Sequence, residues 1–258
     1  MTVPSTTTTT TPAIISTTMT VPSTTITPTP TSTLSSTTAT LQNATGINAD
    51  IVFLVDSSSD ISPANYKKEK DFVASLARQL GFGSGNSRLA LVLYNVFHMQ
   101  ALRFDVVDNP TALQMIFDGF VLQSRGRRLD RALVGAAMML KQSRRNVRKI
   151  VILLTAGEQT QKLPLDDIVN QLKAANGERF VIAVGPQVNR KELTPVVDST
   201  KDIFLVNSFD DLMPRIVEIA DHISKGELNA FKATCGISSA RDLLKNKLEK
   251  RKGKEGKI

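Results

Sequence analysis

The sequence predicts an α/β domain with a mostly parallel sheet that helices cover on both faces. Short, continuous apolar runs alternate along the chain with amphipathic stretches of helical spacing. A strand buried on both faces needs an unbroken apolar run, and the alternation of such strands with helices is typical of a doubly wound sheet. Ligands of these sheets bind beyond the carboxyl ends of the strands, which directs attention to the loops after Val55, Val121 and Leu154.

The predicted elements follow one another with recognisable boundaries. Residues 51–55 form the first strand, and a helix begins at Ser62-Pro63, because a serine N-cap and a proline in the first turn are typical helix starts. Gly81 ends this helix. Further strands are predicted at 89–94, 99–106 (an edge strand), 150–154, 180–184 and 203–206. Further helices are predicted at 111–117, 129–140, 165–175 (ending at Gly177) and after Pro214, the last with Leu212, Ile216, Ile219, Ala220 and Ile223 on one face.

The N-terminal segment differs sharply from this domain. Residues 1–49 contain no charged side chain, and 31 of residues 1–45 are Thr, Ser or Pro. Because such a segment buries too little apolar surface to offset its ordering entropy, residues 1–48 are predicted to be a disordered, mucin-like stalk, with an unmodified linker as the alternative. Asn43 begins an N-glycosylation acceptor, Asn-Ala-Thr. The segment 1–7 recurs at 19–25, so we expect the chain to be a fragment of a longer protein with an upstream signal peptide.

The basic charge lies mainly at the other end. Residues 225–258 carry ten Lys or Arg and four Asp or Glu, and thus +6 of the net charge of +8. The domain itself is nearly neutral and aromatic residues are only 5%, which argues against nucleic-acid binding. The cluster at 245–254 predicts affinity for heparin-like glycans or, alternatively, a solvated helix end. Two Gly-X-Y triplets at 253–258 could open a collagenous segment.

The single cysteine and the absence of long apolar runs limit the cellular setting. Cys235 cannot form a disulfide within the chain, so it is a candidate for an interchain disulfide if the protein is secreted. No run of 18 apolar residues exists, and no membrane span is predicted.

The loop after the first strand reads Asp56-Ser57-Ser58-Ser59-Asp60. Carboxylates and hydroxyls just beyond a buried strand form an oxygen cluster that suits Mg²⁺. The alternative is a serine-rich cap for the following helix. The spacing alone does not separate the two interpretations.

At this loop the sequence resembles the von Willebrand factor type A domain family, and the resemblance spans residues 49–224. It is closest to the modules of collagen VI-like and matrilin-like matrix chains. The resemblance implies a six-stranded sheet of order 3-2-1-4-5-6 with an antiparallel third strand at the edge. The matching segments, in the family's order, are DIVFLVDSSSDIS, SRLALVLY, RALVGAAMML, KIVILLTAGE, RFVIAVG and IFLVNSFDDL.

The family's metal ion-dependent adhesion site is only partly matched. Asp56 and Ser58 agree with it, whereas Asp60 replaces a Ser, Arg127 stands where a Thr is expected, and Ala156 where an Asp is expected. The resemblance therefore implies a lost site without a metal cofactor, and the alternative is a Mg²⁺ site built from Asp56, Ser58 and Asp60. We further expect Arg127 or Arg128 to pair with Asp56 or Asp60 in the ion's place, unless both arginines point to water.

These features together predict a secreted, non-enzymatic extracellular matrix or adhesion protein that binds proteins such as collagens. The expected partner-binding face contains Ser57, Ser59, Arg125, Arg127, Arg128 and Glu158. A nucleotide- or metal-using α/β enzyme is the alternative from another class. It is disfavoured because the glycines at 81–85 follow a helix rather than a strand, and because His98 and His222 have no nucleophile in a triad-like arrangement.

Overall fold

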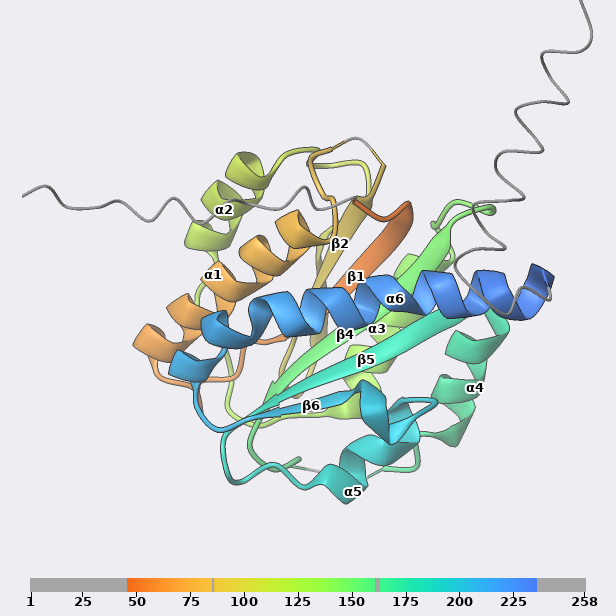
Figure 1. Ribbon diagram of the computed structural model, residues 1–258. Helices are drawn as coiled ribbons and strands as arrows, with labels where there is room; N and C mark the ends of the chain where they lie inside the picture. Colours follow the sequence, from red (N-terminus) through yellow and green to blue (C-terminus); the bar gives the residue numbers. More distant parts are fainter. Residues whose placement is uncertain (1–45, 85, 161–162, 236–258) are drawn as a thin grey trace, which may run out of the picture. The chain divides into compact units, whose positions relative to one another are not determined.

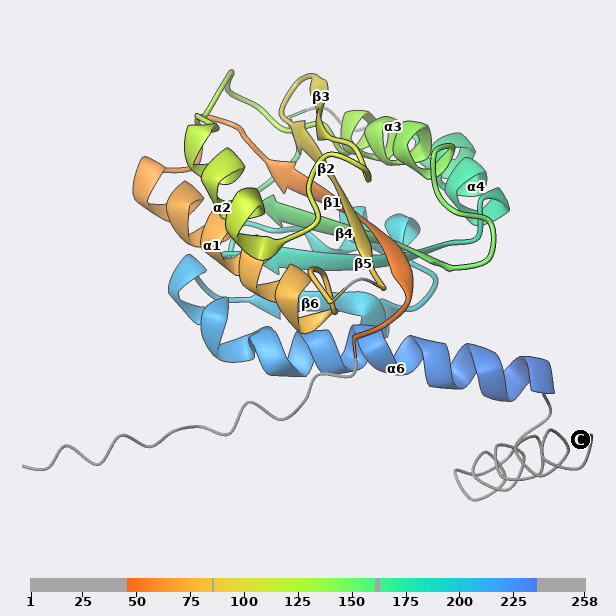
Figure 2. The ribbon, with the colours of Figure 1, turned by 90° about the horizontal axis from the view of Figure 1, so that it is seen from above.

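β1 (Ala49–Asp56) lies inside a six-stranded sheet of order β3-β2-β1-β4-β5-β6 (Figures 1 and 2). The other strands are β2 (Arg88–Tyr94), β3 (His98–Leu102), β4 (Arg148–Ala156), β5 (Gly177–Val184) and β6 (Ile203–Val206). β3 runs antiparallel to β2, and all other neighbouring strands are parallel. The computed structural model describes residues 46–84, 86–160 and 163–235, with side chains as far as 226. The predicted doubly wound fold and its strand order are confirmed.

Helices cover both faces of this sheet. They are α1 (Pro63–Gln79), α2 (Pro110–Gly119), α3 (Leu129–Leu140), α4 (Asp166–Ala174), α5 (Arg190–Leu193) and α6 (Ile216–Cys235), with 3₁₀ turns η1 (Thr194–Val196), η2 (Thr200–Asp202), η3 (Phe209–Asp211) and η4 (Met213–Arg215). α1, α2 and α6 pack on one face, and α3, α4 and α5 on the other (Figure 2). Side chains of β1 alternate between the two cores: Phe53 and Val55 enter the first, Val52 and Leu54 the second. Burial of both faces explains the unbroken apolar runs.

The helix starts follow the local signals in the sequence. Ser62 Oγ accepts a hydrogen bond from the Asn65 N–H (3.2 Å), and Asn109 Oδ1 accepts one from the Ala112 N–H (2.9 Å). A proline follows each cap at the first helical position, where its missing N–H leaves no bond unmade. Pro214 lies in the 3₁₀ turn before α6, so the regular helix begins only at Ile216, as predicted.

Two boundaries differ from the prediction by three residues or more. β3 ends at Leu102 rather than at 106, because the chain turns there and Phe104 packs into the second core beneath the Arg88 guanidinium. The turn after α4 is made by Asn176, which adopts a φ of 56°, and Gly177 is already the first residue of β5. Asparagine tolerates the left-handed region better than most residues, so a glycine is not needed at this turn.

Folded residues extend past both ends of the predicted domain. Ile47 is buried in the first core, and α6 continues to Cys235. Among the described helices, none combines the length and the apolar character that crossing a membrane requires.

A buried carboxylate fastens β1 to its surroundings at its amino end. Asp50 has no exposed surface and accepts hydrogen bonds from Arg88 Nε (3.0 Å) and Nη2 (2.7 Å) and from the Arg144 N–H (2.6 Å) and Nε (2.9 Å). Burial alone would raise the pKa of Asp50, but the hydrogen bonds from the two arginines outweigh it and lower the pKa. The network joins β1, β2 and the loop after α3.

We predict that Asp50→Asn lowers the free energy of unfolding at neutral pH by about 2–4 kcal/mol, because it leaves two arginines without their anion. The side chains of these arginines are 31% and 35% exposed, which keeps the loss below that of a fully buried pair. Since the pKa of Asp50 is lower in the folded state, its contribution is complete above the ordinary carboxyl pKa and disappears as the pH falls through the folded value. Urea unfolding from pH 7 downward measures this.

The matched control is Asp71→Asn, which breaks an exposed pair with Lys67. We expect no resolvable change in the free energy of unfolding for this variant. Equal losses for the two variants would contradict the role assigned to Asp50.

Candidate functional site

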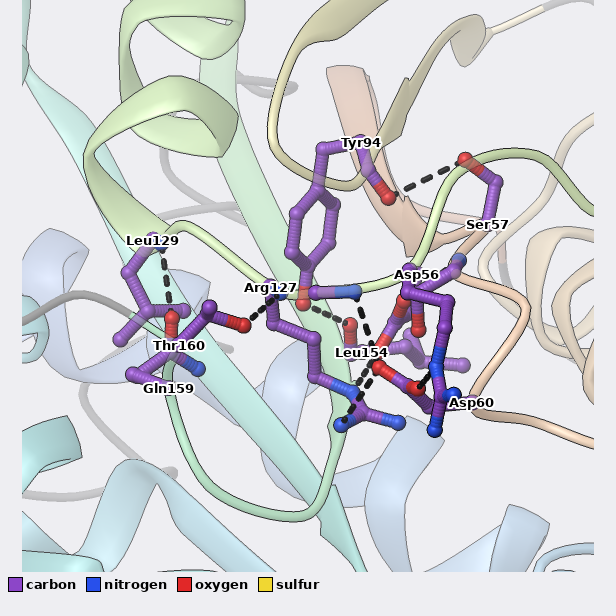
Figure 3. A network of polar contacts seen from close by, with 12 residues as sticks. Asp56, Ser57, Asp60, Tyr94, Arg127, Leu129, Leu154, Gln159 and Thr160 are labelled. Atoms are coloured by element: carbon purple, nitrogen blue, oxygen red, sulfur yellow. Dashed lines mark hydrogen bonds and ion pairs between the residues drawn. The ribbon is translucent and has the colours of Figure 1, made fainter.

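Three loops converge at the carboxyl ends of β1 and β4 (Figure 3). The loop after β1, residues 57–62, lies beside residues 123–128: the Gln123 N–H donates to Ser57 O (2.8 Å), and Ser58 forms an isolated bridge with Gln123. The third loop, residues 157–160, follows β4. All three loops, those after Val55, Val121 and Leu154, were predicted as ligand-binding positions.

An ion pair between Asp56 and Arg127 occupies the centre of the site. Arg127 Nε lies 2.5 Å from Asp56 Oδ2, and the Ser58 N–H donates to Asp56 Oδ1 (2.8 Å). The Asp56 side chain is fully buried, and that of Arg127 is only 11% exposed. Burial raises the pKa of Asp56, and the charge of Arg127 together with the Ser58 N–H partly offsets this rise. The pairing expected for Arg127 is thus present.

Asp60 forms a second, more exposed set of contacts above this pair. Its Oδ1 accepts a hydrogen bond from Arg125 Nε (3.0 Å), and its Oδ2 accepts one from the Gly126 N–H (2.9 Å). Arg127 Nη1 lies 3.7 Å from Asp60 Oδ2, an ion pair beyond hydrogen-bond distance. The Gly126 N–H and the two arginines lower the pKa of Asp60, although burial opposes them, so this carboxylate is ionised at neutral pH.

The third loop fixes the backbone that carries Arg127. The Arg127 N–H donates to Thr160 Oγ1 (2.7 Å), the Thr160 N–H donates to Arg127 O (3.0 Å), and the Leu129 N–H donates to Gln159 Oε1 (2.8 Å). Gly157 has a φ of 80°, and a Cβ at this position would lie 3.2 Å from Arg127 Nη1. Gln159 and Thr160 were not predicted as site residues, because no spacing rule in the sequence connects them to Arg127.

The residues present do not fit the metal ion of the family's site. A guanidinium lies against the carboxylate that would hold the ion, and Ala156 offers no side-chain oxygen. Within the described residues, no group of three or more His, Cys, Asp or Glu side chains could hold a metal. Placing a divalent cation beside Arg127 would add repulsion between like charges in a buried setting.

A second buried carboxyl lies close to Asp56. Glu69 of α1 is fully buried, and burial, followed by the nearby charge of Asp56, raises its pKa well above the ordinary value. Glu69 Oε2, Tyr66 Oη and Ser58 Oγ are buried without a hydrogen-bond partner among the described residues. Glu69 was not predicted as a site residue; the signal that could have identified it is a charged residue three positions after Tyr66, on the apolar face of the helix.

The other residues of the expected partner-binding face differ in how exposed they are to solvent. Ser59, Arg125 and Glu158 are exposed, whereas Ser57 is buried and its Oγ donates to Tyr94 O (3.1 Å). Arg128 does not pair with Asp56 or Asp60: its Nε and Nη2 donate to Asp130 (3.0 and 2.6 Å), the first acidic residue of α3. Of the two arginines that the expectation named, Arg127 therefore forms the pair, whereas a carboxylate two residues away satisfies Arg128 locally.

Other predicted features lie away from this site. Gly81 and Gly83 have positive φ values and form a turn, as predicted. His222 Nε2 lies 2.8 Å from Asp202 Oδ1. His98 lies in the edge strand β3, where burial lowers its pKa. Asn43, residues 245–254 and the side chain of Cys235 lie outside the described part of the chain.

Comparison with known proteins gives a family, related chains and a structural neighbour. The family model described as von Willebrand factor type A domain matches residues 50–218. The collagen alpha-5(VI) chain of Mus musculus is 26% identical over 176 residues, covering 64% of this chain and 6% of that protein. Integrin alpha-M of Mus musculus is 27% identical over 180 residues, covering 64% of this chain and 15% of that protein. The matched segment thus spans a small part of each relative's length.

A solved structure of proximal thread matrix protein 1 from the mussel byssus superposes on this chain with a TM-score of 0.64. That structure is described as having zinc in its MIDAS motif, the metal ion-dependent adhesion site. The two chains are 22% identical, and the match covers 68% of this chain and 48% of the other. At this identity the likeness shows the fold alone.

We predict strong coupling between Asp56 and Arg127 in a double-mutant cycle. Either single change to Ala leaves a buried, uncompensated charge and lowers the free energy of unfolding by about 3–5 kcal/mol. The double variant should lose much less than the sum of the two, because it leaves neither charge behind. Chemical unfolding of the four proteins at neutral pH measures the coupling.

The control cycle joins Asp60→Ala with Arg125→Ala. The Arg125 side chain is 86% exposed, so these two losses should be additive to within about 1 kcal/mol. Additive losses in the Asp56–Arg127 cycle as well would show that the observed pair does not act as a unit.

Proposed function

The chain belongs to the von Willebrand factor type A domain family, and on this premise we propose that it is a secreted, non-enzymatic extracellular matrix or adhesion protein. Its type A domain binds other proteins, and collagens are the proposed partner class. The relatives that support this proposal are a collagen VI chain and an integrin.

Binding takes place without a metal ion. The observation that carries this step is the ion pair between Arg127 and Asp56, because the guanidinium occupies the space beside the only fully buried carboxylate of the three loops. Proximal thread matrix protein 1, by its description, holds zinc in its MIDAS motif, so metal binding is compatible with the fold. We attribute metal-free binding in this chain to Arg127 and Ala156 rather than to its architecture.

The proposed contact surface is the exposed part of the three loops. Ser59, Arg125 and Glu158 offer accessible polar groups at the carboxyl edge of the sheet. Their backbone is held by the bonds of Asp60, Thr160 and Gln159 described above, so little ordering would be needed when a partner binds.

The segments on either side of the domain extend the proposal. Cys235 forms an interchain disulfide, Asn43 carries an N-linked glycan, and residues 1–48 serve as a glycosylated stalk. The basic cluster at 245–254 binds heparin-like glycans through screened charge attraction.

We predict that the full chain binds immobilised collagens equally well in millimolar Mg²⁺ and in EDTA. The melting temperature should likewise not change between the two, since an ion that bound the folded state would stabilise it. Surface plasmon resonance and differential scanning fluorimetry measure the two quantities. The double variant Arg125→Glu with Glu158→Arg keeps the net charge and should weaken binding, because both exposed contacts are reversed.

A saturable rise of the melting temperature with Mg²⁺, or loss of binding in EDTA, would instead support the Mg²⁺-dependent alternative through Asp56, Ser58 and Asp60.

We predict that heparin retention depends on the C-terminal segment. A chain ending at residue 237 should elute from heparin at much lower salt than the full chain, because residues 238–258 carry eight Lys or Arg against three Asp or Glu. Salt-gradient elution of the two chains measures this. Identical elution would assign the affinity to the domain.

A further inference from the structure

β3 forms one edge of the sheet, and within the described residues no strand lies on its outer side (Figure 2). Among the same residues, no backbone hydrogen bond joins residues 98–102 to any segment other than β2. An uncovered edge leaves N–H and C=O groups free to pair with another strand, and proteins commonly block such edges with lysine or proline. β3, with the sequence His-Met-Gln-Ala-Leu, contains neither. Its register with β2 shifts once, between Leu91 and Val92, and residues 98–100 pair regularly.

Large apolar side chains are exposed around this edge. Phe97, directly before β3, is 69% exposed, and Met99 within the strand is 41% exposed. Met138 of α3 is also exposed, and its Sδ lies 3.5 Å from Gln100 Nε2. Apolar groups that gather at a surface are typical of interaction sites. The edge therefore offers both unpaired backbone groups and apolar side chains to a partner strand.

The edge is complementary in size to a second copy of itself. When two copies pair antiparallel about a two-fold axis at Gln100, Met99 of each copy lies opposite Ala101 of the other, and the two Gln100 residues face each other. A large, exposed side chain then meets a small one, and the two amides can exchange a hydrogen bond. Met99 lies opposite Leu93 of β2, which enters the first core, so Met99 would extend this core across the axis.

The edge is also compatible in charge with a second copy. Like charges near a two-fold axis face one another and oppose symmetric pairing. β3 contains no Asp, Glu, Lys or Arg. Burial, followed by the charge of Arg131, lowers the pKa of His98, so the strand is uncharged at neutral pH. Arg103, the exposed residue that follows β3, comes near Phe97 of the second copy, where a cation can lie over the ring.

We propose that β3 pairs antiparallel with β3 of a second copy of this chain, so that the two sheets join into one around a two-fold axis at Gln100. Each copy contributes the same surface, as a symmetric dimer requires. The pairing is non-covalent and involves neither Cys235 nor the three loops of the candidate site, so it is independent of the proposed function. Because a single short strand forms a small interface, we expect a monomer–dimer equilibrium at micromolar concentrations.

Sedimentation equilibrium of the full chain tests this, with a reducing agent that keeps Cys235 as a thiol. We expect dimers that dissociate on dilution. Met99→Lys should raise the dissociation constant of the dimer by about tenfold or more, because it places a cation at the apolar edge. Met115→Lys makes the same change on α2, at a residue that is 72% exposed, and should keep the constant within about twofold. A chain that stays monomeric, or equal dimerisation of the two variants, would overturn the proposal.

A cross-link tests the position of the axis. Residues directly opposed in an antiparallel pair have Cα atoms about 4.5–5.5 Å apart, which is within the range that a disulfide bridges. Gln100→Cys in a Cys235→Ser background should therefore form a disulfide-linked dimer on mild oxidation. Met115→Cys in the same background is the control and should remain monomeric. Failure of Cys235→Ser with Gln100→Cys to cross-link, or equal cross-linking of the control, would contradict the assigned pairing.

Discussion

A carboxylate without any exposed surface has to be matched by a cation, and this constraint organises the carboxyl edge of the sheet. Asp56 ends β1 at the centre of the sheet, and Arg127 reaches it from a loop that is distant in sequence. Holding the guanidinium there requires the backbone of Arg127 to be fixed, which Thr160 does from the loop after β4. The three loops are therefore joined through one ion pair, and removing either partner would leave the other charged and buried.

The same edge contains a carboxyl for which no second cation is provided. Glu69 lies near Asp56, and one guanidinium cannot match two buried charges. Burial and the charge of Asp56 raise the pKa of Glu69, so its neutral, protonated form is favoured and no second cation is needed. Tyr66 Oη and Ser58 Oγ nearby also have no partner within the described residues. Such groups reduce stability and are typical of sites where an arrangement serves binding rather than folding.

Much of this architecture follows from local sequence signals, because those signals act over short distances. The apolar run 51–55 must be buried on both faces, and the caps at Ser62 and Asn109 act within one helical turn. The chain reversal at Asn176 was misplaced by one residue because both asparagine and glycine tolerate a positive φ. The path after Leu102 depends on where Phe104 packs, and spacing does not encode this.

The candidate site was predictable in position but not in detail. The strand ends placed the loops, and two arginines beside two aspartates suggested an ion pair. Which arginine forms it depends on backbone direction: Arg127 points inward to Asp56, whereas Arg128 directly precedes α3 and pairs with Asp130. The contributions of Gln159, Thr160 and Gly157 arise only from the packing of the third loop against the second.

Arg127 belongs to the same covalent chain as Asp56, and this changes the thermodynamics of the site. A dissociable ion occupies its site only to the extent that its free concentration exceeds its dissociation constant. A guanidinium on the same chain does not have to bind from solution. Its effective concentration at the site is set by the length and rigidity of the loop that carries it. Because the pair is buried, dissolved salt screens it little. The occupancy of this cation position is therefore governed by the folding equilibrium of the chain and not by the mineral composition of the medium.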